Sequence, residues 1–241
     1  MSVNSSPILE LRNISKSFPG VKALDNVSLA IDGSSVMALV GENGAGKSTL
    51  IKIITGVYPT YEGTMLLYGQ KVKFNNPRDA FNAGISVVHQ ERNLIDTFTI
   101  AENIFLERIT DRATRRINMK PLYEEAEKYL DMVGLKVSPK DGLANLKAGQ
   151  KQLLEIARAL SRDAKIIMLD EPTASTSIKE SEELLEIIDR LRSQGYTFIY
   201  VSHKLEEVFR IADKICVLRD GKNAGEIMSR PDFDRDTVIK Q

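Results

Sequence analysis

Short apolar segments alternate with amphipathic segments along most of the chain. Runs that are rich in aliphatic and β-branched residues predict strands, and they lie at residues 8–18, 27–31, 36–40, 166–169, 197–201 and 215–218. The run at 36–40 is apolar at every position, which is typical of a strand buried on both faces of a parallel sheet. Glycines follow this run at once, so the predicted strand leads into a tight loop.

Apolar residues at helical spacing predict helices in four places. These helices lie at residues 50–54, 121–134, 150–161 and 177–195. The second has Pro121 near its first turn and Gly134 just after its end, and the fourth has Ser177 as N-cap with Glu180 three residues later. Strands that alternate with helices indicate an α/β fold with a mostly parallel sheet, and the helical stretch from about 91 to 160 is interpreted as an insertion in that core.

The balance of charge limits the partners to expect. The 241 residues include 33 basic and 33 acidic side chains, so no net charge draws the chain toward nucleic acid, and we expect no nucleic-acid partner. No run approaches 18 uninterrupted apolar residues, and residues 1–11 lack the features of a signal peptide, so we expect neither a membrane span nor export. Cys216, the only cysteine in the sequence, lies in an apolar run and is expected to be buried, in keeping with a reducing cytoplasm.

Residues 41–48, with the sequence Gly-Glu-Asn-Gly-Ala-Gly-Lys-Ser, match the phosphate-binding pattern G-x-x-x-x-G-K-[ST] in full. The loop follows a predicted buried strand and precedes a predicted helix, which is the context that the motif requires. Its glycines allow backbone N–H groups to point at phosphate oxygens, and the helix N-terminus adds partial positive charge. Lys47 would reach the β- and γ-phosphates and the Ser48 hydroxyl would ligate Mg²⁺, whereas a chance glycine turn would not need the strand, lysine, hydroxyl and helix together.

Another predicted strand, at 166–169, ends in Asp170 and Glu171. A Mg²⁺ ion held by nucleotide phosphates needs a carboxylate near it, and we expect Asp170 to supply it. Side chains alternate along a strand, so Glu171 should point to the other side, where we expect it to act as general base on the attacking water. A solvated strand end is the alternative interpretation for both acids, and the presence of the phosphate loop favours the functional one.

Together these motifs resemble those of the ATP-binding subunit of ABC transporters, and the resemblance covers nearly the whole chain. The Walker A loop lies at 41–49 and Walker B at 166–170. Further motifs appear in the order of that family: the Q-loop glutamine Gln90, the signature Leu-Lys-Ala-Gly-Gln at 146–150, the D-loop at 174–177 and the switch histidine His203. Each is weak alone, but a P-loop kinase or GTPase would have no reason to carry the whole set.

The resemblance implies a fold and a set of site residues. The fold would be a P-loop NTPase core with a mostly parallel sheet, an N-terminal antiparallel β subdomain and an inserted α-helical subdomain, together one ATP-binding domain over 1–241. ATP would be bound by Phe18, which stacks on adenine, and by Gly41, Asn43, Gly44, Gly46, Lys47, Ser48 and Thr49. Mg²⁺ would be held by Ser48, Gln90 and Asp170, and the catalytic residues would be Glu171, His203 and Gln90. Lys147, Gly149 and Gln150 would contact the ATP that a partner domain binds.

Within the family, residues 84–91 and 99–106 are similar to the importers of ribose, galactose, xylose and related monosaccharides. Those ATPases are usually tandems of two ATP-binding halves, and this sequence resembles the N-terminal half, so we expect either a part of a longer protein or a half-size relative. The resemblance implies ATP-driven closure of two such domains, as a homodimer or as fused halves. It also implies a membrane permease as partner, contacted by residues from about 91 to 107, a sugar-binding protein as indirect partner, and a cytoplasmic position on the inner face of the cell membrane.

Two motifs depart from the family. The signature has Lys147 where a serine usually reaches the γ-phosphate, and a long cation cannot reproduce that short neutral contact. We therefore expect the site that uses this signature to be weakened and the site on this Walker A loop to be intact. The D-loop has Thr176 and Ser177 where leucine and an acid are common, which puts communication between the two sites in question.

Two other functions are alternatives to a sugar-import ATPase. One is a nucleotide-gated clamp that scarcely hydrolyses, which Lys147 favours and which Glu171 with His203 disfavours. The other is a soluble ABC ATPase of translation or DNA repair, which the neutral chain and the transporter-like segment at 90–106 disfavour.

Overall fold

Strands from distant parts of the chain lie side by side in the main sheet. The computed structural model describes residues 6–89, 94–110 and 118–240. Across the sheet the strands are β10 (Lys222–Asn223), β9 (Lys214–Arg219), β3 (Val36–Val40), β8 (Thr197–Val201), β7 (Ile166–Asp170) and β6 (Ile85–Val88), with β11 (Met228–Ser229) paired to β9. The pairs β9/β3, β3/β8, β8/β7 and β7/β6 are parallel, which confirms the prediction of a mostly parallel sheet.

A second sheet is antiparallel and lies near the N-terminal part of the chain. Its order is β2 (Val21–Ile31), β1 (Leu9–Phe18), β4 (Glu62–Leu67) and β5 (Gln70–Val72), which confirms the expected antiparallel β subdomain. The hydrophobic pattern does not predict β4, β5 or β6. Each has six residues or fewer: β4 buries only Met65 and Leu67, and β5 buries no residue, so neither gives a long alternating pattern.

Helix α1 (Lys47–Ile54) packs between the two sheets. Its apolar residues Leu50, Ile51, Ile53 and Ile54 are buried in one cluster with side chains of β1, β2, β3 and β7. The helix that was predicted to follow the phosphate loop is therefore confirmed. Because α1 is held by apolar residues on both sides, the loop that precedes it has a fixed position relative to the main sheet.

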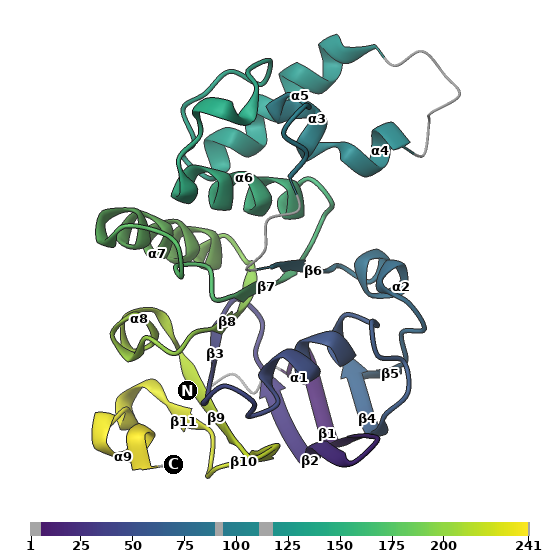
Figure 1. The fold of residues 1–241 in the computed structure, drawn as a ribbon, viewed down its shortest axis with the longest axis vertical. Coiled ribbons are helices and arrows are strands. Elements are labelled where there is room, and N and C mark those ends of the chain that lie inside the picture. The colour runs from purple at the N-terminus through teal and green to yellow at the C-terminus, as the bar shows by residue number, and fades with distance from the viewer. Residues whose placement is uncertain (1–5, 90–93, 111–117, 241) are drawn as a thin grey trace.

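The helices of the middle segment lie together at one end of the molecule, in the upper part of Figure 1. They are α3 (Ile100–Ile104), α4 (Leu106–Thr110), α5 (Met119–Met132) and α6 (Ala148–Leu160). The remaining helices are α2 (Pro77–Asn82), α7 (Ile178–Ser193), α8 (Leu205–Ile211) and α9 (Arg235–Lys240), and short 3₁₀ turns lie at Leu143–Asn145 and Arg230–Asp232. The inserted helical subdomain is thus confirmed, whereas its expected limits of about 91 and 160 stay a prediction.

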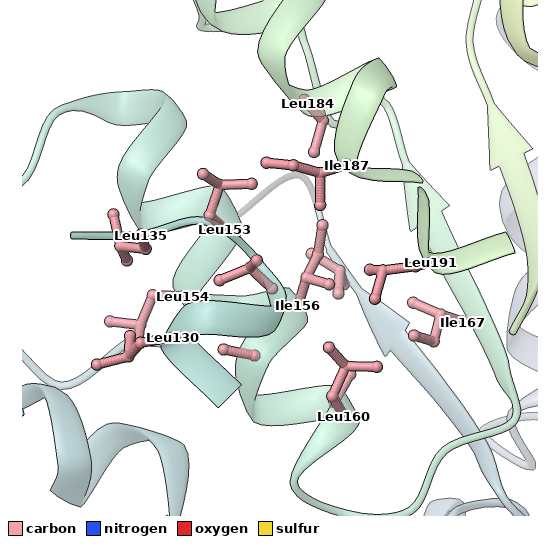
Figure 2. Packing of buried hydrophobic residues seen from close by; sticks show 14 of the residues in the cluster. Leu130, Leu135, Leu153, Leu154, Ile156, Leu160, Ile167, Leu184, Ile187 and Leu191 are labelled. Atoms are coloured by element: carbon pink, nitrogen blue, oxygen red, sulfur yellow. The ribbon is translucent and has the colours of Figure 1, made fainter. Parts of the chain in front are cut away.

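A hydrophobic core joins this helical part to the main sheet (Figure 2). The side chains drawn there include Leu153, Leu154, Ile156 and Leu160 of α6, Leu184, Ile187 and Leu191 of α7, and Ile167 of β7. Most are positions that helical spacing predicted, and the capping box of Ser177 and Glu180 at the start of α7 is confirmed. Each buried aliphatic side chain stabilises the fold by about 1.5–3 kcal/mol, so this layer fixes α6 on the sheet.

Two further expectations concern the interior and the membrane. Cys216 in β9 is 1% exposed, and burial raises the pKa of its thiol to about 11, so the prediction of a buried cysteine is confirmed. Within the described ranges, no helix combines the length and the apolar character that crossing a bilayer requires.

Candidate active site

Three loops that carry predicted site residues meet at one edge of the main sheet. β3, β8, β7 and β6 are consecutive parallel strands, so their carboxyl ends lie at the same edge. The phosphate loop follows β3, His89 follows β6, Asp170 ends β7 and Glu171 follows it, and His203 comes two residues after β8. This edge is where ligands bind in open α/β sheets, and the topology brings residues to it that are up to about 160 positions apart in sequence.

The phosphate loop is held between strands of both sheets. Gly46 has a φ of 101°, and a Cβ there would lie 2.6 Å from Leu24 Cδ2 and 2.8 Å from the carbonyl oxygen of Ala23, both in β2. A Cβ on Gly41 would lie 2.3 Å from the carbonyl oxygen of Leu218 in β9. The loop approaches these strands so closely that a side chain at position 41 or 46 would displace it.

Lys47 lies beneath the loop rather than in solvent. It is 8% exposed, and its ammonium donates hydrogen bonds to the carbonyl oxygens of Gly41 at 2.6 Å and Glu42 at 2.9 Å. Burial lowers the pKa of Lys47, and the carboxylates of Glu171 and Asp170 partly offset that effect. The loop therefore holds a cation in the electrostatic field of the two acids at the end of β7.

The N-terminus of α1 is open toward an anion. Gly46 is its N-cap and provides no capping side chain, and the first turn of α1 contains no acidic residue. The N–H groups of a first helical turn have no intrahelical acceptor and carry partial positive charge. Ser48, Asn43 and Gly44 are exposed around this helix end, and Thr49 is half-buried. The residues predicted to bind phosphate thus surround a helix end that favours a bound anion.

Asp170 is a half-buried carboxylate that borders the phosphate loop. Burial and the neighbouring Glu171 carboxylate raise the pKa of Asp170, and His89, Lys47 and Lys52 partly offset the rise. The ionised form of Asp170 is thus poorly solvated in this site, and a cation beside it would be stabilising. This environment is compatible with the predicted role as a metal ligand, which stays a prediction.

Glu171 leaves the strand in a backbone conformation that is rare for its residue type. The strand ends at Asp170, and Glu171 has a φ of 47°, with its backbone N–H donating to the carbonyl oxygen of Val201 at 2.9 Å. The expectation that the two acids diverge because side chains alternate along a strand therefore gives the wrong reason. The left-handed turn at Glu171 redirects the chain, and such strain is often found in catalytic loops.

Glu171 and His203 contact each other across neighbouring strands. The Oε1 atom of Glu171 lies 3.1 Å from Nδ1 of His203, so the sheet brings together two residues that the family resemblance predicted to be catalytic. The Glu171 side chain is 18% exposed and that of His203 is 61% exposed. The carboxylate is therefore largely shielded from solvent, while the imidazole is mostly exposed.

Phe18 ends β1 and lies against a second aromatic ring. Its ring centroid is 5.2 Å from that of Tyr58 at an interplanar angle of 68°, an edge-to-face contact. The Lys16 ammonium lies 5.2 Å from the Phe18 ring centroid and donates to the carbonyl oxygen of Thr60 at 2.5 Å. Sequence reasoning missed Lys16 and Tyr58, although an aromatic residue soon after α1 is a signal that could have indicated the second ring. The stacking of adenine on Phe18 stays a prediction.

The predicted signature residues lie at the start of α6, which Figure 1 shows in the upper part of the molecule, apart from α1. Lys147 is exposed, and its backbone N–H donates to Gln150 Oε1 at 2.9 Å. The Gly149 N–H donates to Glu180 Oε1 at 3.3 Å, and a Cβ on Gly149 would lie 2.9 Å from Glu180 Cβ. The structure thus keeps the signature away from the phosphate loop of the same chain.

The Q-loop glutamine lies outside the described residues, whereas the D-loop at 174–177 lies within them. Gln90, predicted as a catalytic and metal-binding residue, lies outside the described residues. In the D-loop, the Thr176 hydroxyl donates to the carbonyl oxygen of Thr173 at 3.2 Å, and Ser177 is the N-cap of α7. The serine at the position where an acid is common therefore has a local structural role, because serine is among the preferred N-cap residues.

Comparison with known proteins adds independent evidence. Residues 24–174 match the family model described as ABC transporter. The chain is 46% identical over 235 residues to the ribose import ATP-binding protein RbsA of Clostridium perfringens (strain 13 / Type A), which covers 97% of this chain and 47% of that protein. It is 48% identical over 234 residues to the xylose import ATP-binding protein XylG of Moorella thermoacetica, covering 96% and 46%. The chain thus spans about half the length of the curated relatives it matches.

A solved structure supports the same assignment. The dimeric structure of a post-hydrolysis state of the ATP-binding cassette MJ0796, bound to ADP and Pi, superposes with a TM-score of 0.78 at 26% identity and covers 93% of this chain and 100% of that chain. The matched family model spans more than half of the present sequence and includes both Walker motifs. The chain therefore belongs to the ABC transporter family, as the order of its motifs predicted.

Proposed function

We propose that this chain binds ATP with Mg²⁺ and hydrolyses it to drive the import of a simple sugar through a membrane permease. One arrangement carries the proposal: Lys47 lies in the field of Asp170 and Glu171, and Glu171 contacts His203 at 3.1 Å. A cation for the phosphates, a carboxylate for the metal and a carboxylate for the attacking water are the parts that phosphoryl transfer to water requires. Similarity to ribose and xylose import proteins supports the transport role and the class of sugar.

The phosphates of ATP would lie on the loop at 41–49. Lys47 would exchange its carbonyl partners for phosphate oxygens, and Gly44, Asn43 and the open first turn of α1 would supply backbone N–H donors. Adenine would stack on the ring of Phe18, which the edge-on contact with Tyr58 orients. The lowering of the Lys47 pKa by burial supports this role, because an ammonium that burial destabilises is stabilised by a nearby phosphate.

The residues at this edge fit a Mg²⁺ ion that is shared with a nucleotide. Mg²⁺ is usually held by one or two carboxylates together with substrate phosphates and water, and Asp170 with the Ser48 hydroxyl is a donor set of that kind. The raised pKa of Asp170 supports the assignment, because a divalent cation would restore the ionised carboxylate that burial disfavours. We infer that Gln90 completes the protein's contribution. When bound, the ion would neutralise negative charge on the phosphates.

Glu171 is the residue that we propose as general base. Its carboxylate is largely shielded from solvent, its backbone is left-handed, and its side chain contacts His203. The base would take the proton of the attacking water, while His203, which is more exposed, would hold the Glu171 carboxylate in place and contact the γ-phosphate. Two carboxylates in one site would then serve different steps because their surroundings differ.

A second ATP-binding domain would complete each site. The signature at the start of α6 lies apart from the phosphate loop of its own chain, so Lys147, Gly149 and Gln150 would contact ATP only when it is held by another domain. The dimeric structure of the similar cassette MJ0796 supports this arrangement. We propose that residues 1–241 act as one such domain and pair with a second copy or with a fused second half. Binding of ATP would favour the closed pair and hydrolysis would release it.

The membrane partner would be a permease that carries the sugar. We propose that the region from about 91 to 107, of which 94–107 is described, contacts a cytoplasmic helix of that permease, and that Gln90 links this contact to the metal site. The chain would then lie on the inner face of the cell membrane without entering it. The sugar itself would be selected by the permease and a separate binding protein.

The experiment that tests the proposed function is steady-state Mg²⁺-ATP hydrolysis by the isolated chain over a wide range of protein concentration, with Glu171→Gln as the blank. We expect the rate to rise faster than linearly with concentration, because two domains must meet, and the blank to be inactive. Binding of ATP without turnover at any concentration would indicate that a second half or the permease is needed. A rate that Glu171→Gln leaves unchanged would contradict the assignment of the general base.

A further inference from the structure

A carboxylate in α8 joins the segment after β7 to the start of α8. Glu207 Oε2 accepts hydrogen bonds from the Thr173 hydroxyl and from the Tyr200 hydroxyl, both at 2.7 Å. Glu207 Oε1 lies 3.3 Å from the Lys204 ammonium. The same ammonium donates to the carbonyl oxygen of Thr173 at 2.9 Å. These contacts close a ring that includes Thr173, Tyr200, Lys204 and Glu207, which we name the Glu207 ring.

The Glu207 ring is shielded from water. Tyr200 is fully buried in β8, Thr173 is 2% exposed, and the side chain of Glu207 is 11% exposed. Burial and the Glu207 carboxylate together raise the pKa of Tyr200, so its hydroxyl keeps its proton and donates it. The Glu207 carboxylate is shielded and is bound by two hydroxyl donors and an ammonium. Loss of any of these contacts would leave a buried charge poorly solvated, so the Glu207 ring has one strongly preferred arrangement.

The ring lies next to both members of the Glu171–His203 pair. Thr173 is two residues after Glu171, and Pro172 between them restricts rotation of that segment. Lys204 directly follows His203. Glu207 therefore binds one residue close to each member of the pair, and it does so from a helix that packs beside the edge of the sheet.

We propose that Glu207 is a positioning residue for hydrolysis: it holds the segments that carry Glu171 and His203 at the separation that permits their 3.1 Å contact. The inference rests on the proposed function, because it assigns Glu207 to the reaction only if Glu171 and His203 act on ATP. The geometric part, that Glu207 sets the contact of the pair, can be tested without any reaction.

The chain offers a matched pair of variants. Glu207→Gln keeps the size of the side chain, and its amide oxygen can still accept from both hydroxyls, but it turns an NH₂ group toward Lys204 in place of an anion. Glu206→Gln makes the same chemical change one residue earlier. Glu206 is exposed and pairs with Arg235 at 2.9 Å, on the solvent side of α8. A difference between the two variants therefore reports on the ring and not on the general charge of the helix.

The first measurement separates kcat from KM for ATP. We expect Glu207→Gln to lower kcat by about tenfold or more, because small displacements of catalytic groups have large effects on rate, while KM changes by less than about twofold since the phosphate loop is untouched. Glu206→Gln should leave both constants unchanged. A folded Glu207→Gln variant with the kcat of the original chain would overturn the proposal.

The second measurement is the imidazole signal of His203 by nuclear magnetic resonance, which needs no turnover. The sequence contains two histidines, so His203 is assigned by its loss in His203→Ala. We expect the signal to move in Glu207→Gln in the direction seen for Glu171→Gln, and to stay in place in Glu206→Gln. An unmoved signal in Glu207→Gln would overturn the proposal even in an inactive chain. A moved signal together with an ATPase rate that Glu171→Gln leaves unchanged would instead support the positioning and contradict the roles that the proposed function gives to the pair.

A third variant covers the case in which Glu207→Gln does not fold. Tyr200→Phe removes one hydroxyl donor to Glu207 and keeps the aromatic side chain that packs in the core. We expect it to move the His203 signal in the same direction by a smaller amount, and a signal identical to that of the original chain would overturn the proposal.

Discussion

Alanine at Gly46 tests whether the phosphate loop is fixed by its packing on β2. Gly46 has a φ of 101°, and an L-residue in a left-handed conformation is disfavoured by about 1–2 kcal/mol. The new Cβ would also lie 2.6 Å from Leu24 Cδ2 and 2.8 Å from the carbonyl oxygen of Ala23. Ala23 belongs to β2, so its carbonyl cannot move aside without displacing the strand, and overpacking of this kind costs about 1–3 kcal/mol. We therefore expect Gly46→Ala to lower the free energy of unfolding by about 2–5 kcal/mol.

Alanine at Gly44 is the matched control, because it imposes the conformational penalty without the packing conflict. Gly44 has a φ of 88°, and apart from Gly44 and its two chain neighbours no atom of the described residues lies within 4 Å of a Cβ built there. Gly44→Ala should therefore cost only about 1–2 kcal/mol. For a chain of this length, 1 kcal/mol corresponds to roughly 2–4 °C in Tm, so Gly46→Ala should melt roughly 2–12 °C below Gly44→Ala.

The comparison is made by thermal and urea unfolding of both variants without nucleotide, so that loss of a ligand does not enter the result. Equal slopes of free energy against urea concentration would confirm that the native states are compared on the same scale. If both variants lose the same stability, the close approach of Gly46 to β2 does not constrain the loop, and the reasoning from its packing is refuted.

Three other predictions concern charged residues of the signature and of the phosphate-binding region. Lys147→Ser should tighten ATP-dependent homodimerisation of the Glu171→Gln variant about 5- to 150-fold, the worth of two neutral hydrogen bonds, because each of the two sites uses one signature. An unchanged dissociation constant in analytical ultracentrifugation would contradict the weakened-site hypothesis. Asp170→Asn should raise Tm without nucleotide at pH 7. Burial raises the pKa of Asp170, so the ionised carboxylate disfavours the folded state above that pKa. The increase in Tm should disappear below about pH 4, where Asp170 is protonated in both the folded and the unfolded state. Lys47→Met should abolish the rise in Tm that ATP produces and leave Tm without ATP at or above that of the original chain, because burial lowers the pKa of Lys47 and its charge disfavours folding at neutral pH. A lower Tm of Lys47→Met without ATP would show that its hydrogen bonds to the loop outweigh the burial of its charge.

The parts of the fold that depend on local sequence could be predicted. The strand at 36–40, the glycine-rich loop and the helix at Lys47–Ile54 are adjacent, so one short window contains all the evidence for the phosphate site. The capping box of Ser177 and Glu180 is equally local. The short strands β4, β5 and β6 could not be predicted in this way, because their pairing partners and not their own patterns determine them.

The contact between Glu171 and His203 depends on register, which the sequence pattern does not contain. Asp170 is paired with Val201 across β7 and β8, and this register brings the next residues of the two strands together. Both strands are almost entirely buried, so a shift by one residue would still bury apolar side chains, and the hydrophobic pattern alone does not select the register. The motif order of the family predicted both residues, but their contact at 3.1 Å comes only from the structure.

Glu206 and Glu207 show the same limit within one helix. In the sequence they are two adjacent acids in the first turn of a short amphipathic segment, where a solvated face is the ordinary interpretation. In the structure one faces solvent and pairs with Arg235, while the other is bound by the hydroxyls of Thr173 and Tyr200. What distinguishes them is the position of β8 beneath the helix, and no local property of the two residues records it.

The groups proposed to serve ATP share a physical property that separates them from the Glu207 ring. Burial lowers the pKa of Lys47 and raises that of Asp170, so each charge is held in surroundings that disfavour it, and Glu171 has a strained backbone. A bound phosphate would stabilise the charge of Lys47, and a divalent cation that of Asp170. Binding would therefore offset the desolvation cost of these two buried charges. Glu207, in contrast, has its donors within the fold. Ligand binding and folding stability are therefore coupled through Lys47 and Asp170, and substitutions that remove those charges should stabilise the fold at the expense of function.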